Sequence, residues 1–263
     1  MTKKYAKPEE FSTLELMAVC GSRQIKNGQV VFIGTGLPMI AAMLAKKTHA
    51  PAAKIVYEAG FIDSNAKEIA LSIADSRLGY RASGAIGLIE TLGVMLQGGH
   101  VDLGFVGAAQ IDEYGNINTS YIGDFEKPSV RLPGSGGGND IVSSAKHIVI
   151  IMTHEKRKMV KKLDYLTSPG FLNGPAAREK AGLIGGGPLL VVTNLCQMDF
   201  DPKTKRIRLA TLHPGVTVQQ VKDNSGFDLI IPENVPSTEP PTLDELALLR
   251  AIDPNGIYIP RTK

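Results

Sequence analysis

The sequence predicts an α/β protein with an open, mostly parallel sheet and flanking helices. Apolar runs of strand length alternate with segments of helical periodicity, and glycines directly follow several of the expected strands. A strand, a glycine turn, a helix and a second strand follow one another from Gln29 to Tyr57, which is the order of a βαβ unit. The chain has no internal repeat and no clear linker, so we expect a single domain over residues 1–263.

Helices are expected where apolar residues recur at helical spacing. Ser12 and Thr13 are candidate N-caps of the first helix, with Glu15 in its first turn, and Pro38 stands where the second begins. The expected helices are residues 13–24, 39–47, 87–96, 155–163, 217–224 and 242–252.

Strands are expected at the apolar, β-branched runs between these helices. They cover residues 29–33, 54–57, 103–106, 147–152, 189–193 and 207–212. Turns are expected at residues 112–116 and 253–256, where Asp, Asn and Gly cluster.

Composition limits the class of protein. Hydrophobic residues make up 43% and charged residues 21%, as in soluble globular proteins. A net charge of +3 is too small to argue for nucleic acid, and no stretch is apolar enough to span a bilayer. The N-terminus lacks an apolar signal core, so we expect a cytoplasmic protein. Cys20 and Cys196 are far apart between apolar residues, which predicts buried thiols and no metal site.

Glycines mark one edge of the expected sheet. Gly34, Gly36, Gly60 and Gly107 each stand directly after an apolar strand. Ligands of open parallel sheets bind outside the carboxyl ends of the strands, where glycine lets the backbone approach them closely. The pattern predicts a small-molecule site at this edge, although tight turns alone would explain any one of these glycines.

Gly34 and Gly36 also allow a dinucleotide interpretation. They open the second helix, and Glu58 follows 22 residues after Gly36, where an acidic residue would contact a ribose. Met39, however, occupies the position of the third small residue and would crowd the helix against the strand. An NAD-dependent oxidoreductase that uses Gly34, Gly36 and Glu58 is therefore the less favoured alternative.

Glu58 is the first candidate catalytic residue. It ends the second strand at the ligand-binding edge, and Ala59 and Gly60 leave space in front of its carboxylate. The plainer interpretation of a lone glutamate at a strand end is a solvated surface carboxylate.

A glycine-rich loop and a basic segment are two further candidates. The loop, residues 133–140, contains Ser135, Gly136, Gly137 and Gly138, whose exposed backbone N–H groups suit a phosphate or an oxyanion. It lacks the Lys-Ser/Thr of a Walker A loop, and a flexible surface loop is the alternative. The basic segment, residues 154–162, does not form an HExxH zinc motif, and a solvated helix face is favoured over a phosphate site.

Taken together, these segments resemble the smaller subunit of glutaconate CoA-transferase, a family I CoA-transferase. The similarity runs over nearly the whole chain, in motifs that are short but specific in their order and spacing. The best matched stretches are residues 34–38, 107–112, 115–118, 134–137, 154–157 and 164–170. Glu58 stands at the position of that family's catalytic glutamate, although the serine that usually follows is Ala59 here.

The resemblance implies a NagB/RpiA/CoA-transferase-like fold and an enzyme that moves CoA between carboxylic acids through a glutamyl-CoA thioester. It implies a larger homologous α subunit, an active site at the junction of the two subunits, acyl-CoA and carboxylate substrates such as glutaconate, and no tightly bound cofactor. Residues 135–138 would serve CoA and the oxyanion, and Gly34, Gly36 and Gln110 would line the substrate pocket. A CoA-ester hydrolase or decarboxylase of the same superfamily and a non-catalytic binding protein stay open as alternatives.

Overall fold

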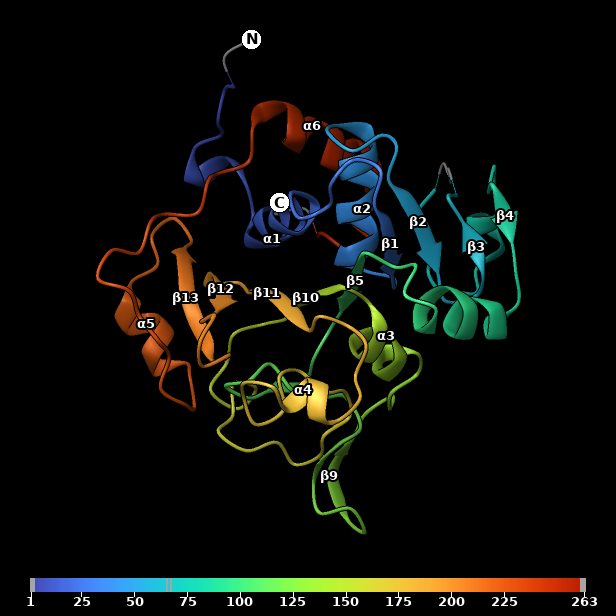
Figure 1. The fold of residues 1–263 in the computed structure, drawn as a ribbon. Helices are drawn as coiled ribbons and strands as arrows, with labels where there is room; N and C mark the ends of the chain where they lie inside the picture. The colour runs from blue at the N-terminus through green and yellow to red at the C-terminus, as the bar shows by residue number, and fades with distance from the viewer. Residues whose placement is uncertain (1–2, 65, 67, 261–263) are drawn as a thin grey trace. The chain divides into compact units, whose positions relative to one another are not determined.

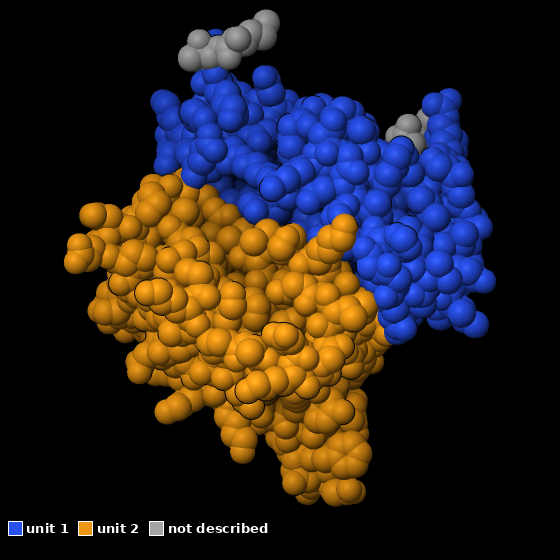
Figure 2. All heavy atoms as spheres, viewed as in Figure 1, with its two compact units in different colours: residues 1–105, 239–263 blue, residues 106–238 orange. Residues whose placement is uncertain are grey.

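The structure, a computed structural model, describes residues 3–64, 66 and 68–260. The chain divides into two compact units, coloured separately in Figure 2. Unit 1 comprises residues 1–105 and 239–263, and unit 2 comprises residues 106–238. The expectation of one domain over residues 1–263 stays a prediction.

Unit 1 is built on a sheet with the strand order β5-β1-β2-β3-β4. The strands are β1 (Val30–Ile33), β2 (Lys54–Tyr57), β3 (Phe61–Ile62), β4 (Gly84–Ala85) and β5 (Leu103–Val106), within which the chain passes into unit 2. β1 pairs in parallel with β2 and β5, whereas β3 and β4 add antiparallel pairs (Figure 1).

Three α-helices accompany this sheet and pack on one another. They are α1 (Thr13–Ser22), α2 (Leu37–Lys47) and α6 (Leu243–Ile252). Ser12 and Thr242 begin α1 and α6 with capping boxes, in which a glutamate three residues on bonds back to the cap. Shorter helical segments are the 3₁₀ turns η1 (Pro8–Glu10) and η2 (Ser76–Gly79) and the π-helix η3 (Glu90–Gln97).

Unit 2 contains a second set of strands in the order β10-β11-β12-β13. They are β10 (His147–Ile151), β11 (Pro188–Val192), β12 (Cys196–Phe200) and β13 (Ile207–Leu212), of which β10 and β11 are parallel. Two hairpins and three helices complete the unit: β6 (Gln110–Ile111) with β7 (Ile117–Asn118), β8 (Tyr121–Gly123) with β9 (Pro128–Arg131), α3 (Gly138–Ser144), α4 (Ala177–Lys180) and α5 (Val218–Asp223). The α/β class is confirmed, with parallel strands at the centre and antiparallel strands added outside them.

Two expected helices differ from the structure. Residues 155–163 form one turn and not a helix, because the backbone on either side of Met159 pairs with Ile111: Ile111 N–H donates to the Lys158 carbonyl, and Val160 N–H donates to the Ile111 carbonyl. Residues 87–96 are helical from Leu88 on, close to the expected bounds, but from Glu90 to Gln97 they wind as a π-helix.

A buried arginine ties the loops of unit 2 together. The Arg178 guanidinium donates to five backbone carbonyls at 2.8–3.1 Å, those of Val142, Ser143, Pro169, Gly170 and Gly185. Burial lowers the pKa of Arg178 to about 10, which leaves it charged at neutral pH. These bonds fix the carboxyl-terminal half of α3, the helix that directly follows the glycine-rich loop.

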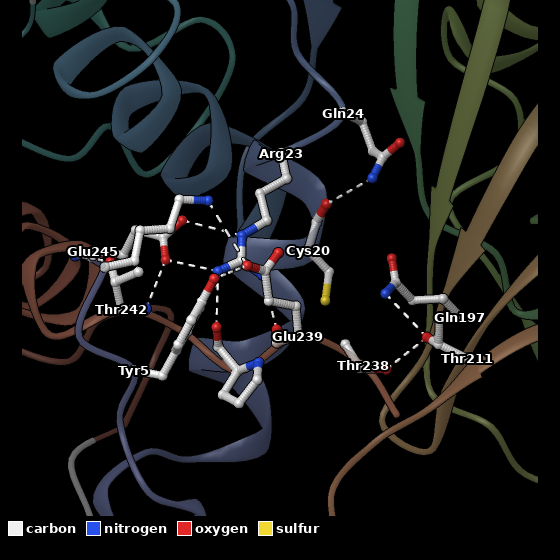
Figure 3. A network of polar contacts seen from close by, with 12 residues as sticks. Tyr5, Cys20, Arg23, Gln24, Gln197, Thr211, Thr238, Glu239, Thr242 and Glu245 are labelled. Carbon is white, nitrogen blue, oxygen red and sulfur yellow. Dashed lines mark hydrogen bonds and ion pairs between the residues drawn. The ribbon is translucent and has the colours of Figure 1, made fainter. Parts of the chain in front are cut away.

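Arg23 joins the two sequence segments of unit 1. Its guanidinium forms a bidentate pair with Glu245 at 2.8 and 3.1 Å and donates to the carbonyls of Glu239 and Pro240 at 2.8 Å (Figure 3). Bidentate geometry of this kind is specific to arginine. It attaches the segment before α6 to the end of α1.

Cys20 and Cys196 are buried and free, as the sequence predicts. Burial raises the pKa of each thiol to about 12, so neither is a thiolate at neutral pH.

The turn after β2 can be made only with glycine at its last position. Gly60 N–H donates to the Tyr57 carbonyl at 2.8 Å, and Gly60 has a φ of 95°. A Cβ at Gly60 would lie 1.8 Å from the carbonyl oxygen of Ile86, whose N–H donates to Gly60. Both the dihedral and the space exclude a side chain.

Just beyond this turn, Asp63 holds two lysines. Lys54 Nζ lies 3.0 Å from its carboxylate, and Lys46 forms a second ion pair with it. Although burial opposes the charge, the hydrogen bonds from these lysines lower the pKa of Asp63 below its ordinary value. Together, the two ion pairs of Asp63 connect α2, which contains Lys46, to β2, which contains Lys54.

Replacing Gly60 by alanine should destabilise the chain by about 3 kcal/mol, since the Cβ adds a clash with Ile86 to an unfavourable φ. Urea unfolding measures the change. Gly28→Ala is the matched control, because Gly28 has a φ of 84° but no atom within 4 Å of an added Cβ. Equal losses in both variants would contradict a role for the close approach to Ile86.

Asp63→Asn should cost about 1–3 kcal/mol at pH 7, because two charge-assisted hydrogen bonds are weakened while the shape is kept. A lowered folded-state pKa stabilises the fold above the unfolded pKa of about 3.9, and this contribution is lost as pH falls through the folded-state pKa. The free energies of unfolding of the two proteins should therefore converge below about pH 4. A constant difference from pH 7 to pH 3, measured against the exposed control Glu126→Gln, would exclude this ion pair as the cause.

Candidate active site

The pairing of β1 with β2 places Gly34 level with Glu58. Ile33 and Tyr57 are register partners in this parallel pair, and each is the last residue of its strand. Gly34 and Glu58 are the next residues, so both leave the sheet at its carboxyl edge, on neighbouring strands about 4.8 Å apart. The register thus places both residues at one edge of the sheet, and their roles in a site stay predictions.

The residues around the ends of β1 and β2 in unit 1 have small side chains or none. A Cβ built at Gly34 meets no atom within 4 Å, so open space lies beside the end of β1. Ala59 follows Glu58, and both are partly exposed. Gly60 then anchors the turn to Ile86, which fixes the direction in which the chain leaves β2.

Gly36 begins α2 and Met39 closes its first turn. Gly36 is the N-cap with a φ of 82°, and Pro38 lies in the first turn where its missing N–H is not needed. Met39 is 1% exposed and belongs to the core of unit 1. A buried methionine therefore occupies the position that the dinucleotide fingerprint reserves for a third small residue.

The glycine-rich loop lies in unit 2 and leads into α3. Its first end is held by Thr119, whose carbonyl accepts from Gly134 N–H at 2.9 Å and whose hydroxyl donates to the Gly134 carbonyl at 2.8 Å. Gly134 and Gly136 have φ values of 95° and 47°, so the loop uses conformations that favour glycine. The loop is thus held by Thr119 at its first end and continues directly into α3 at its second.

The loop's N–H groups are not equivalent. Gly138 N–H donates to the Ser135 carbonyl at 2.8 Å and is already satisfied inside the turn. Ser135 hydroxyl donates to the Gly136 carbonyl at 2.9 Å. Gly136 and Ser135 are exposed, whereas Gly137 is buried. Gly136 is consequently the exposed glycine of the loop.

Gln110 has a structural role in unit 2. It is 4% exposed, its amide nitrogen donates to Asp164 at 2.8 Å, and its carbonyl oxygen accepts from the Asn118 side chain at 2.8 Å and from Asp164 N–H at 3.1 Å. These bonds hold the β6–β7 hairpin against the loop after β10. That Gln110 also lines a substrate pocket stays a prediction.

A pocket that was not expected from the sequence lies against Tyr57, the residue before Glu58. It has a volume of about 470 Å³ and lies between α2 and the segment after β3. Its lining includes Met43, Lys47 and Arg81, together with the Lys46–Asp63 pair. In the sequence, the two consecutive lysines at the end of α2, Lys46 and Lys47, were the available indication of this pocket. Arg81 joins them only in the folded chain.

Two other findings concern the described residues as a set. Among them, no three His, Cys, Asp or Glu side chains are grouped so as to hold a metal ion. None of the helices in the described ranges combines the length and the apolar character needed to cross a bilayer.

Comparison with known proteins identifies close relatives over nearly the full length. A chain of Pseudomonas knackmussii named as a subunit of 3-oxoadipate CoA-transferase is 43% identical over 243 residues, which are 92% of this chain and 94% of that one. A chain of Acidaminococcus fermentans named as a subunit of glutaconate CoA-transferase is 40% identical over 255 residues, 95% of each chain. The crystal structure of glutaconate coenzyme A-transferase from Acidaminococcus fermentans superimposes with a TM-score of 0.90 at 37% identity, covering 99% of this chain and 100% of that chain.

The family described as "Coenzyme A transferase" matches residues 14–224, which include Glu58 and the glycine-rich loop. With the relatives above, this match confirms the resemblance found in the sequence. The chain belongs to the coenzyme A transferase family and is an enzyme of the CoA-transferase type.

Proposed function

We propose that this chain is the catalytic, smaller subunit of a heteromeric CoA-transferase and that Glu58 carries CoA as a glutamyl thioester. The observation that supports this most is the position of Glu58, which directly follows β2 at the carboxyl edge, level with Gly34 and the open space beside it. A purely structural carboxylate would not need such small neighbours.

In the first half-reaction a Glu58 carboxylate oxygen attacks the thioester carbonyl of the donor. The carbon–sulfur bond breaks, CoA leaves as the thiolate, and a mixed anhydride forms between Glu58 and the donor acyl group. The thiolate then attacks the glutamyl carbonyl of this anhydride. The donor acid leaves as its carboxylate, and Glu58 is left as the CoA thioester.

The acceptor acid runs the same steps in reverse. Its carboxylate attacks the glutamyl thioester, the thiolate leaves and then attacks the acceptor acyl carbon, and Glu58 is regenerated. One thioester is exchanged for another of similar energy, so no ATP is consumed. A carboxylate suits this exchange because it acts as both nucleophile and leaving group, whereas serine or cysteine would form a more stable acyl-enzyme.

Each attack forms a tetrahedral oxyanion. We assign Gly136 N–H as one donor to this charge or to CoA, because it is exposed and has a glycine conformation. Gly138 N–H is excluded from this role by its bond to Ser135. One such donor typically contributes about 3–4 kcal/mol to transition-state stabilisation.

The substrates we propose are acyl-CoA thioesters of dicarboxylic acids and the free acids. The two relatives named above act, by their names, on 3-oxoadipate and glutaconate, each of which carries a second carboxylate. Gly34 and Gly36 would line the acyl pocket, where the absence of side chains leaves room for the chain of the acid.

The proposal includes a partner. Each of these relatives is named as one subunit of its enzyme, which implies a second chain, a larger homologous α subunit that completes the active site. CoA then acts as a substrate and not as a resident cofactor, and residues 1–263 act as one domain of a cytoplasmic enzyme.

Glu58→Gln in the complex with the partner subunit should lower kcat on the order of 10³-fold or more, because an amide cannot form the anhydride. Wild type incubated with acyl-CoA should gain one CoA on the peptide that contains Glu58, seen by mass spectrometry. Glu126→Gln, an exposed carboxylate of the β8–β9 turn, should change neither result.

Two outcomes would refute this role of Glu58. The first is full activity of Glu58→Gln. The second is turnover of an acyl-CoA with no CoA adduct, accompanied by CO₂ release or carbon–carbon cleavage, which would place the chain with decarboxylases or hydrolases of the superfamily.

Gly34→Val should reduce kcat/KM about 100-fold, since the new side chain fills the space beside Glu58. Its free energy of unfolding should change by less than about 1 kcal/mol, because a Cβ there meets no neighbour. Gly34→Ala should lie between Gly34→Val and wild type, and Gly93→Ala is the control at another glycine with open space. Unchanged kinetics in Gly34→Val would mean that the acyl group does not pass this point.

A further inference from the structure

Unit 2 contains a groove that the proposed chemistry at Glu58 does not use. It has a volume of about 960 Å³ and lies between the turn after β10, α5 and the segment that follows α5. Lys156, Lys161 and Lys222 stand along it, and Phe227, Leu229 and Ile231 form an apolar side. All three apolar residues are partly exposed, as the walls of a binding groove would be.

The charge in this groove is positive and largely unbalanced. Arg206 and Glu113 pair with each other, and the remaining carboxylate in the lining is Asp228. Within the described part of the chain, none of the three lysines takes part in an ion pair. Three cations therefore face a concave surface with one unpaired anion, which favours an anionic ligand.

The backbone that carries the first two lysines is fixed. Met159 lies between them, is fully buried, and bridges Ile111 through hydrogen bonds of 2.8 and 2.9 Å on either side. This bridge is also what prevents residues 155–163 from continuing as a helix. Lys156 and Lys161 therefore lie on a loop whose backbone is held by hydrogen bonds, and not on a free surface helix.

The opposite wall is fixed as well. Gly226 N–H donates to the Met159 carbonyl at 2.7 Å, and a Cβ at Gly226 would lie 2.3 Å from that oxygen. Further along, the Ile230 carbonyl accepts from Leu209 N–H of β13 at 2.9 Å. The apolar residues on either side of Ile230 are therefore held in place before any ligand arrives.

The floor beside α5 is polar but uncharged. Ser225 hydroxyl donates to the Val221 carbonyl at 2.8 Å and lies 2.9 Å from His154 Nε2. Burial lowers the pKa of His154 to about 4, so this imidazole is neutral at physiological pH. The positive charge of the groove thus comes from the lysines.

We propose that this groove binds a phosphorylated ligand that carries an aromatic or apolar group, the chemistry of a nucleotide. Phosphate groups would bind Lys156, Lys161 and Lys222, and the base would pack on Phe227 and its apolar neighbours. Two sources share this chemistry: a free nucleotide and the nucleotide end of CoA. The proposal does not depend on Glu58.

Calorimetric titration of the full chain with ADP tests the site. ADP should bind, adenosine should bind much more weakly, and added salt should weaken ADP binding because the lysines lie at the surface. The double variant Lys161→Ala, Lys222→Ala should lose affinity about tenfold or more, whereas Lys162→Ala, the neighbouring lysine outside the groove, should not. Thermal unfolding of each variant checks that the fold is kept.

Absence of ADP binding to the wild type, or equal affinity in the double variant, would overturn the proposal. The two sources are separated by kinetics in the complex with the partner subunit. If the double variant raises KM for acyl-CoA at unchanged kcat, the groove holds the nucleotide end of CoA; if KM is unchanged while ADP binding is lost, the ligand is a separate nucleotide. Glu58→Gln should bind ADP like wild type, so failure at Glu58 and failure of this site are distinguishable.

Discussion

The close approach of Gly60 to the carbonyl of Ile86 is the constraint on which the geometry at the end of β2 depends. A Cβ at residue 60 would lie 1.8 Å from that oxygen, and the residue has a φ of 95°. The turn is therefore sharp and has one conformation, so the residue after Tyr57 emerges at a defined point of the carboxyl edge. The placement of Glu58 on the chain thus depends on a neighbour without a side chain.

In the function proposed above, the same edge gives room for chemistry without a deep cavity. Parallel pairing sets the ends of β1 and β2 at one level, and Gly34 after β1 and Ala59 after Glu58 leave little side chain to cover them. Reactive groups need water exclusion and orientation, and both are easier to arrange on strand ends than on mobile loops. Within unit 2, Gly136 also combines a glycine conformation with an exposed position.

The sequence predicts the long, strongly patterned elements well, and the failures have local causes. Residues 54–57, 103–106 and 207–212 are strands with the expected bounds, because short runs rich in apolar residues between turns favour strands. Helical periodicity predicts a helix over residues 155–163, because a local pattern carries no information about the distant Ile111, whose backbone pairs with theirs. Likewise, the position of Gly34 and Glu58 directly after two paired strands follows from the sequence, whereas the bonds that engage Gln110 come from side chains 8 and 54 residues away.

The Arg23 cluster has a consequence for how this protein is made. Unit 2 is one continuous stretch of chain, but unit 1 needs residues 239–260 to close on α1 through the bonds to Glu239, Pro240 and Glu245. During translation the first 105 residues leave the ribosome long before the segment that covers them. Domains fold as their residues emerge, so unit 2 can reach its native state before α6 has been synthesised. Until then the apolar residues of α1 that α6 covers remain exposed. In that interval the nascent chain is most prone to aggregation and most dependent on chaperones.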